Sequence, residues 1–492
     1  MPKGTPGAKT ISVKSKSMTI NVLDGYTYED SDNGYKGGLS GAPLNGKLKV
    51  LVYSNFTGDP IPGAVVAVGT GGPDTLVKSV DITGVAIFND ASLNKPKTVT
   101  VGGLCSSPIS FVDVPVDTVT VYLDPVITPE CGELGDPPPV GGKGGSGGYI
   151  QGELVWPGAI EFQKAGWTNV PLPVGADEQQ AAYVFLTTSD PTAGFNLPSP
   201  AAAVTTNSPG GIGYEFFYYT SPGNKTMYAL AGIENRKVSP PKFTAYAMGV
   251  VSGVAVVPDG TVQNVYIPMN KTIDQVFSMD VTAPVPGPKG PDRLKATVSI
   301  MLGNNGFAIL PSGLKSPLLP FDGLLKFTYV PALNNELAGA AYLSTARAGT
   351  GPNYSAPLSV VGRMLSNSTS QSIPVNGFVG VPTLNTPAPN SPWDGRHLAV
   401  NFAPGAPIDL TVYEVISGNG LIRWTIAVPK GANSIELPDL GPIPHGSIPS
   451  GPITISIYGA RIDAFDYGNL RYRHLRPQGM TAYSLDSFSA FR

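Results

Sequence analysis

Side chains that could do chemistry are few in this sequence of 492 residues. Its three histidines, His397, His445 and His474, lie far apart, and none has the spacing of zinc ligands. The run Gly144–Gly148 has the letters of a nucleophile elbow, but that turn needs a following helix and this run lies in a glycine-rich stretch. We therefore predict no catalytic residue. A secreted hydrolase that assembles serine, histidine or carboxylate groups from distant positions stays open as an alternative.

Acidic side chains crowd one segment near the start of the chain. Asp24, Glu29, Asp30 and Asp32 fall in a stretch rich in glycine, tyrosine and asparagine that is predicted to be a long loop. Carboxylate oxygens at this density could hold Ca²⁺, although their spacing matches no EF-hand loop. A solvated acidic loop is the favoured interpretation, calcium is the alternative, and no other cofactor is expected.

Basic side chains gather at one place near the other end of the chain: Arg471, Arg473, His474 and Arg476. A nucleic-acid surface would need several such clusters, and the net charge of −3 gives no basic footprint for nucleic acid or an anionic membrane. We predict a charged edge strand that protects a sheet against unwanted pairing. An interaction surface that forms salt bridges with another molecule is the functional alternative.

The chain has two cysteines, Cys105 and Cys131, and we predict that they form a disulfide. The two residues flank the closing strand of the first β unit, so the bond would tie the start of the linker back to that unit and would constrain the unfolded chain by roughly 3 kcal/mol. A disulfide fits an oxidising compartment, so a secreted or cell-surface protein is expected. The first residues lack the apolar core of a signal peptide, which implies that a targeting segment has been removed or that the protein is cytosolic.

The composition favours strands over helices. Glycine and proline number 60 and 50, and charged residues are 14% of the chain against roughly 25% in a typical soluble domain. Long helices exclude glycine and proline, whereas short strands joined by turns use them. The longest weakly polar run, Ala245–Val257, is too short to span a membrane and is predicted to be two short buried strands.

Alternating apolar residues and glycine- or proline-rich stretches divide the chain into an arm, four β units and a linker. The arm holds two predicted strands, Thr10–Lys14 and Thr19–Val22. Proline-rich stretches near residues 284–291 and 382–392 mark further boundaries. The predicted division is 1–40 (arm), 41–131, 132–148 (linker), 149–285, 292–390 and 391–492.

The first β unit carries a family resemblance. The runs Pro60–Val66 and Asp81–Phe88, followed by a strand that ends at Leu123–Pro125, are similar to the carboxypeptidase regulatory-like domain, over about residues 45–125. The order Asp81-Ile82-Thr83-Gly84 departs from the more usual pattern. The resemblance implies a transthyretin-like β-sandwich without catalytic residues, used for adhesion, scaffolding or anchoring in secreted bacterial surface proteins. The whole chain is thus expected to be all-β, with tandem Ig-like or transthyretin-like sandwiches.

These observations predict a non-catalytic extracellular or cell-surface structural protein. Its low charge density gives little repulsion between copies, and its strand edges or its N-terminal arm could pair with another copy or dock with a surface partner. A glycan-binding, adhesin-like module is the alternative, and it would require some of the tryptophans to form exposed platforms. Core packing is favoured for most of these residues, which are Trp156, Trp167, Trp393 and Trp424.

Overall fold

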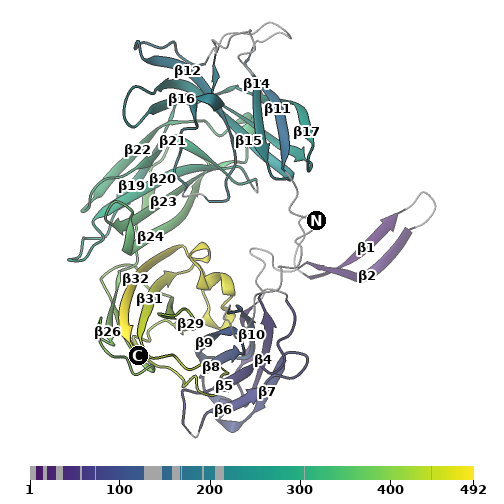
Figure 1. Ribbon diagram of the computed structural model, residues 1–492, viewed down its shortest axis with the longest axis vertical. Coiled ribbons are helices and arrows are strands. Elements are labelled where there is room, and N and C mark those ends of the chain that lie inside the picture. The colour runs from purple at the N-terminus through teal and green to yellow at the C-terminus, as the bar shows by residue number, and fades with distance from the viewer. Residues whose placement is uncertain are drawn as a thin grey trace. The chain divides into compact units, whose positions relative to one another are not determined.

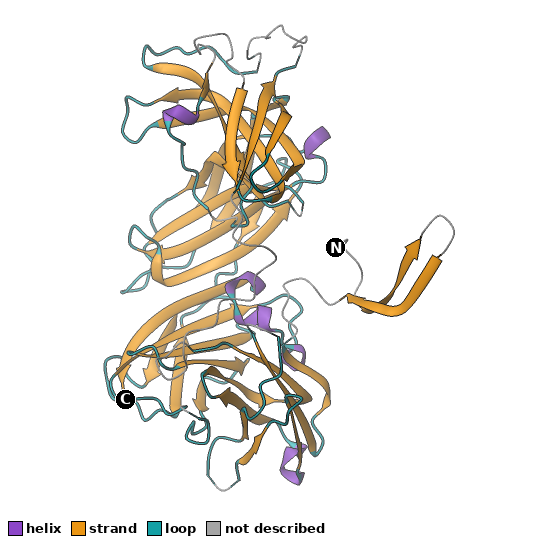
Figure 2. Ribbon diagram, turned by 45° about the vertical axis from the view of Figure 1, so that its right-hand side comes forward, coloured by secondary structure: helices purple, strands orange, loops and turns teal. Residues whose placement is uncertain are grey.

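The chain folds into two compact units, Met1–Pro138 with Val379–Arg492 (unit 1) and Pro139–Phe378 (unit 2). The computed structural model describes residues 7–14, 19–28, 37–55, 58–72, 74–126, 147–157, 167, 169–190, 193–205, 215–303, 305–444 and 446–492. Figures 1 and 2 show strands throughout these residues, and the helices among them are short 3-10 turns. The predicted all-β fold class is therefore confirmed. No helix in the described part of the chain is long and apolar enough to cross a membrane.

Unit 1 is built from three stacked sheets and a separate hairpin. The first sheet has the order β3 (Gly38–Pro43), β10 (Val116–Leu123), β4 (Lys47–Ser54), β7 (Val85–Asn89). The second runs β32 (Ala482–Phe491), β31 (Pro452–Arg461), β28 (Leu410–Ser417), β29 (Arg423–Pro429), β9 (Ser106–Val114), β8 (Lys97–Gly103), β5 (Val65–Val68), β6 (Leu76–Ser79). The third is β26 (Pro382–Thr386), β27 (His397–Phe402), β30 (Ser434–Glu436), and the hairpin is β1 (Gly7–Lys14) with β2 (Thr19–Tyr28).

The second sheet of unit 1 is covered on both faces. Along β28, Leu410 and Val412 belong to the core shared with the first sheet, whereas Tyr413 and Val415 belong to the core shared with the third. Side chains in a strand alternate between its two faces, so a strand that reads as continuously apolar is buried on both. The alternation within β28 thus separates two cores that lie on opposite sides of one sheet.

A parallel ladder joins the two ends of the chain within this sheet. Thr425 of β29 pairs with Ile109 of β9, and the Trp424 indole nitrogen donates a hydrogen bond to Ser110 Oγ at 2.9 Å. The predicted division put residues 41–131 and 391–492 in separate domains, and the structure has them in one unit. Because these two strands lie so far apart in the sequence, no turn motif connects them, and local sequence patterns do not predict that they pair.

Unit 2 also consists of stacked sheets. The outermost has the order β14 (Glu215–Thr220), β11 (Gly148–Val155), β17 (Thr261–Pro268), and the next has β13 (Val204–Thr205), β12 (Glu178–Leu186), β15 (Gly223–Asn235), β16 (Lys242–Val256), β18 (Lys271–Thr272). The remaining strands are β22 (Asp322–Val330), β19 (Gln275–Thr282), β25 (Ile373–Val375) in one sheet and β21 (Phe307–Lys315), β20 (Arg293–Met301), β23 (Ala341–Thr350), β24 (Ser355–Ser366) in another.

The sheet β13-β12-β15-β16-β18 of unit 2 lies between two cores. Alternate residues of β15 enter opposite cores, with Tyr228 in one and Met227 in the other. Residues 245–256 of the weakly polar run lie in the single long strand β16, not in two short strands. Residues 284–291, predicted as a domain boundary, are a loop between β19 and β20, and Val281 and Leu294 on its two sides share one core. Of the predicted linker 132–148, residues 132–146 lie outside the described residues, and Gly148 already begins β11.

Candidate functional site

The basic segment near the C-terminus is the first candidate site. It contains the 3-10 helix η5 (Tyr472–Leu475), which lies between η4 (Tyr467–Asn469) and η6 (Pro477–Gly479). The prediction of a charged edge strand is therefore wrong. Leu475 and its neighbour Leu470 are buried in the core beneath the first sheet, and Leu39 N of β3 donates to Leu470 O at 2.9 Å. The apolar residues Tyr472 and Leu475 are three apart, which matches the turn of a 3-10 helix rather than the period of a strand.

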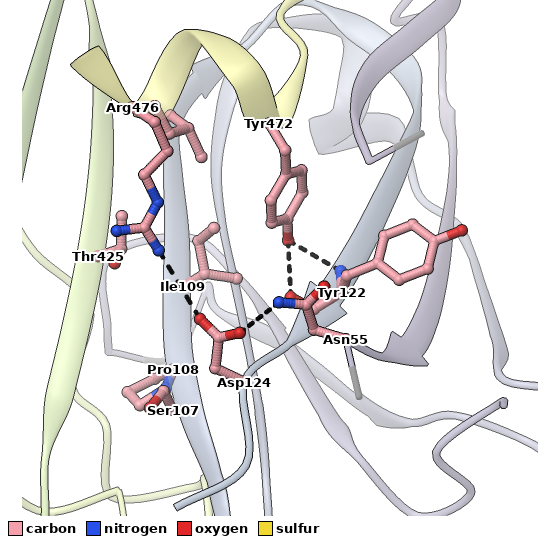
Figure 3. A pocket seen from close by; sticks show the side chains of 10 residues that line it. Asn55, Ser107, Pro108, Ile109, Tyr122, Asp124, Thr425, Tyr472 and Arg476 are labelled. Atoms are coloured by element: carbon pink, nitrogen blue, oxygen red, sulfur yellow. Dashed lines mark hydrogen bonds and ion pairs between the residues drawn. The ribbon is translucent and has the colours of Figure 1, made fainter. Parts of the chain in front are cut away.

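Tyr472 links this segment to the first sandwich of unit 1, which consists of the first sheet and the strands β9, β8, β5 and β6 of the second sheet. Its hydroxyl accepts a hydrogen bond from Tyr122 N at 2.8 Å and donates one to Tyr122 O at 3.2 Å, as Figure 3 shows. The Tyr472 ring meets the Tyr122 ring edge to face at 6.2 Å and the Phe111 ring at 6.5 Å. Burial raises the pKa of the Tyr472 hydroxyl well above its ordinary value, so the hydroxyl stays protonated and acts as a structural link.

A small cavity beside Tyr472 is lined by Asp124, Asn55 and Arg476 (Figure 3). Asn55 Nδ2 donates to Asp124 Oδ1 at 2.5 Å, and the Arg476 guanidinium lies 3.9 Å from Asp124 Oδ2 and 3.5 Å from Glu414 Oε1. The volume of about 50 Å³ has room for a few water molecules and none for an organic substrate. Asp124 and Arg476 are about half exposed, so this ion pair contributes little to stability.

His474 lies inside the same segment and is neutral at ordinary pH. Burial, helped by the charges of Arg473 and Arg471, lowers its pKa to about 4. Its Nδ1 lies 3.1 Å from Arg471 N and its Nε2 lies 3.2 Å from Arg473 Nε. A neutral imidazole has one accepting nitrogen, so one of these two contacts is a hydrogen bond at a time. The role of Arg471, Arg473, His474 and Arg476 as an interaction surface stays a prediction.

The other described histidine, His397, pairs through Nδ1 with Asp394 Oδ2. Although burial opposes it, hydrogen bonds from His397 and Arg396 lower the pKa of the Asp394 carboxyl to about 2. In such a pair Asp394 could orient His397 as a general base, but among the described residues no serine or cysteine hydrogen-bonds to the His397 ring. Asp394 also accepts from the backbone of Arg396 at 2.8 Å and of His397 at 2.9 Å, which makes it a turn-forming residue. His445 lies outside the described residues.

A larger groove, about 650 Å³, lies in unit 2 between Phe195, Phe243 and Tyr329. At its edge the Arg236 guanidinium donates to the Tyr183 hydroxyl at 2.7 Å and to Glu234 Oε1 at 3.2 Å. Burial, together with the hydrogen bond to Glu234, raises the pKa of Tyr183 to about 12. These hydrogen bonds therefore fix side chains at the edge of the groove, and the Tyr183 hydroxyl stays protonated near neutral pH.

The predicted calcium and disulfide residues lie largely outside the described part of the chain. Asp24 is in strand β2, which continues to Tyr28 and so shortens the predicted loop, whereas Glu29, Asp30 and Asp32 are not described. No group of three metal-binding side chains is found among the residues that the structure describes. Cys105 occupies the turn between β8 and β9 with a φ of 58°, and Cys131 lies beyond the described ranges. Both the calcium site and the disulfide stay predictions.

The four tryptophans are buried, and the sequence analysis had favoured core packing for most of them. Trp424 is 0% exposed and the other three are 2–4% exposed. Trp156 and Trp167 stack in one core of unit 2 with ring centroids 4.7 Å apart. A glycan platform made of these tryptophans is therefore wrong. Exposed aromatic residues lie instead on β11, β14 and β17. In β14 aromatic residues occupy both phases, so the sequence gives little warning of which of them are exposed.

The hairpin β1–β2 forms a two-stranded sheet by itself, drawn in purple in Figure 1. The antiparallel register pairs Ile11 with Val22 and Val13 with Ile20, so these four positions lie on one face. Neither strand pairs with any other strand in the described part of the chain. Both strands were predicted, and the structure extends the second one by several residues.

Comparisons with known proteins give only distant likenesses. No protein-family model matches the chain, and no curated protein does. Among solved structures, the Bacillus anthracis TIE protein is 10% identical, with 75% of this chain and 57% of that chain covered and a TM-score of 0.13. A tetra-tandem repeat from the extending region of a large adhesion protein is 10% identical (90% and 99% covered, TM-score 0.13), and a streptococcal ancillary pilin is 8% identical (67% and 98% covered, TM-score 0.16). At these scores the likenesses carry no argument about the fold or the function of this chain.

Proposed function

We propose that the chain is a non-catalytic, extracellular structural protein that self-associates through its N-terminal hairpin. The observation that carries the proposal is the β1–β2 hairpin, a two-stranded sheet with no third strand among the described residues. An isolated two-stranded hairpin is at best marginally stable in water. A neighbouring copy that adds a strand to its edge, or accepts the hairpin at one of its own edges, would supply the missing hydrogen bonds.

The first sandwich supports a scaffolding role through its resemblance to the carboxypeptidase regulatory-like domain. The motif that carries the resemblance forms a turn: Asp81 Oδ1 accepts hydrogen bonds from Thr83 N at 2.8 Å and from Val85 N at 3.0 Å. The hydrogen bond from the Thr83 hydroxyl, together with these backbone hydrogen bonds, lowers the pKa of the Asp81 carboxyl. The motif therefore builds the fold, and its polar groups are used within the turn.

The test is sedimentation velocity over a range of concentrations. Full-length protein is expected to form dimers or larger species, and a chain without residues 1–28 is expected to stay monomeric. The matched control is a chain without residues 1–6, which keeps both strands of the hairpin and should associate like the full-length protein. Circular dichroism would show that both shortened chains retain the β fold.

The proposal also predicts the effect of proline in the hairpin. Backbone N–H groups of successive residues in a strand point in opposite directions, so proline at Ser12 and proline at Val13 remove donors on opposite edges of β1. One of the variants Ser12→Pro and Val13→Pro weakens the hairpin itself, and the other removes a donor that a neighbour would use. Both should lower the average mass in sedimentation. If the chain lacking residues 1–28 associates as strongly as the full-length protein, the hairpin is not the assembly element.

A further inference from the structure

An exposed aromatic surface covers the outer face of the sheet β14-β11-β17 in unit 2. Tyr149, Phe217, Tyr219 and Tyr266 are 52%, 67%, 56% and 54% exposed. The alternate residues of the same strands, such as Ile150, are buried in the core beneath. Scattered single exposed aromatic residues are ordinary, but a group of them on one sheet face marks an interaction site.

The strand register brings these residues together as a platform. Tyr149 of β11 pairs with Tyr219 of β14, Gln151 pairs with Phe217, and Glu153 of β11 pairs with Tyr266 of β17. Residues paired across a ladder share a face, and Tyr149 and Glu153 are two alternations apart on β11. At about 3.3 Å per residue, the platform therefore extends roughly 13 Å along the strands. That length fits several rings of an extended ligand rather than one small molecule.

The tyrosine end of the platform is held in place before any ligand binds. The Tyr149 and Tyr219 ring centroids are 5.0 Å apart with the planes tilted by 56°, and the Tyr219 hydroxyl accepts a hydrogen bond from Gly147 N at 2.7 Å. A Cβ atom at Gly147 would lie 2.6 Å from the Tyr219 ring, so glycine is required for this approach. A ligand that stacks here does not have to immobilise these rings, which lowers the entropic cost of binding.

The polar groups on the same face select the charge of the ligand. Glu153 and Glu215 lie directly opposite one another across the β11–β14 ladder, with Gln151 beside them. Like charges at paired positions are unfavourable unless hydrogen-bond donors reach them. The three strands contain no lysine, arginine or histidine, so nothing on them would attract an anionic ligand. The face fits a ligand that offers hydroxyl donors and carries no negative charge.

We propose that the face formed by Tyr149, Phe217, Tyr219 and Tyr266, with Glu153 and Glu215 between them, binds an uncharged polysaccharide. A pyranose ring presents an apolar C–H face that stacks on an aromatic side chain, and its hydroxyl groups donate to carboxylate oxygens at the ring edge. A second protein chain fits this face less well, because it would bury two facing carboxylates out of reach of water, and burying unpaired charges is costly. The site is separate from the hairpin on which self-association is proposed.

The test is co-sedimentation of the full chain with microcrystalline cellulose, chitin and curdlan, which are insoluble and essentially uncharged, and affinity electrophoresis in gels that contain anionic pectate. Retention is expected on at least one uncharged polymer, with no retardation by pectate. Phe217→Ala and Tyr266→Ala should each weaken the retention about tenfold. Leu324→Ala, which removes an exposed apolar side chain elsewhere in unit 2, is the matched control and should bind like the wild type.

Three outcomes would overturn the proposal: no retention on any of the uncharged polymers, equal retention of the Phe217→Ala and Tyr266→Ala variants, or a fall in sedimentation coefficient for these variants without a change in retention. The last would identify the face as a contact between copies. The chain lacking residues 1–28 should bind the polysaccharide as well as the full-length protein does. A failure of hairpin-mediated assembly would therefore leave the polysaccharide result unchanged.

Discussion

Acid should destabilise unit 1 through His474. The folded protein holds this imidazole with a pKa of about 4, against an ordinary value of 6.5, chiefly because the ring is buried. A lowered pKa means that the unfolded chain takes up the proton first. The stability that the neutral ring contributes is therefore complete above pH 6.5, falls as the pH drops from 6.5 toward 4, and is lost below that.

The size of the effect follows from the difference between the two pKa values. One pKa unit corresponds to about 1.4 kcal/mol, so the difference between 6.5 and about 4 means that protonation of His474 should cost roughly 3.5 kcal/mol of unfolding free energy. The protonated ring would lose its accepting nitrogen beside Arg471 N, 3.1 Å away, and would face the charge of Arg473. A cost of this size is a large part of the stability of a typical domain.

The assay is urea unfolding followed by circular dichroism at a series of pH values from 7.5 to about 4, the pKa of the folded ring. The variant His474→Gln keeps an accepting oxygen and cannot titrate, so its free energy of unfolding should decline less than that of the wild type as the pH falls. The control Gly84→Ala changes the turn before β7 and removes no titratable group, so it should lower stability equally at every pH. Parallel curves for the wild type and His474→Gln across this range would refute the reasoning.

Two further substitutions in unit 1 test named contacts by the same urea unfolding. Tyr472→Phe should cost about 1 to 3 kcal/mol because it leaves Tyr122 N without its 2.8 Å acceptor, whereas Tyr53→Phe, whose ring also packs on Tyr122, should cost less. Gly84→Ala should cost about 2 kcal/mol or more, since Gly84 has a φ of 78° and a Cβ there would lie 2.7 Å from Val52 O. The matched control is Gly63→Ala, at the same φ of 78° but with open space around the Cβ. This variant should lose only the stability that alanine costs at a positive φ. Equal losses at the two glycines would contradict the steric part of the argument.

Strand positions were predictable from the sequence where alternation is clear. Thr118–Leu123 was predicted as a strand and lies within β10, and Lys47–Tyr53 lies within β4. In both strands apolar residues at every second position face a core, so the local pattern carries the information. The high glycine and proline content correctly pointed away from long helices.

Pairing and site geometry were less predictable because they depend on contacts between distant residues. The segment from Arg471 to Arg476 was predicted to be a charged edge strand from its basic residues, yet Tyr472 and Leu475 pack against the first sandwich and the segment forms a 3-10 helix. Likewise, Tyr149 and Phe217 lie in stretches that were expected to be strands, but in the strand of Phe217 both phases contain aromatic residues, so alternation does not reveal which phase faces the core. The exposed platform could be recognised only from the register of three strands.

The ladder between β9 and β29 limits what the resemblance of residues 45–125 means. A free-standing sandwich that ended near residue 131 would leave β9 as an open sheet edge, and Leu410 and Val412 would be missing from its core. Phe111 of β9 is fully buried, and its ring contacts Tyr472 from the end of the chain. An unpaired edge and a partly exposed core are both sources of aggregation, so this sandwich needs the C-terminal residues to be complete. The resemblance therefore describes a pattern of strands and a turn, whereas the folding unit is the first sandwich together with residues 379–492, into which unit 2 is inserted.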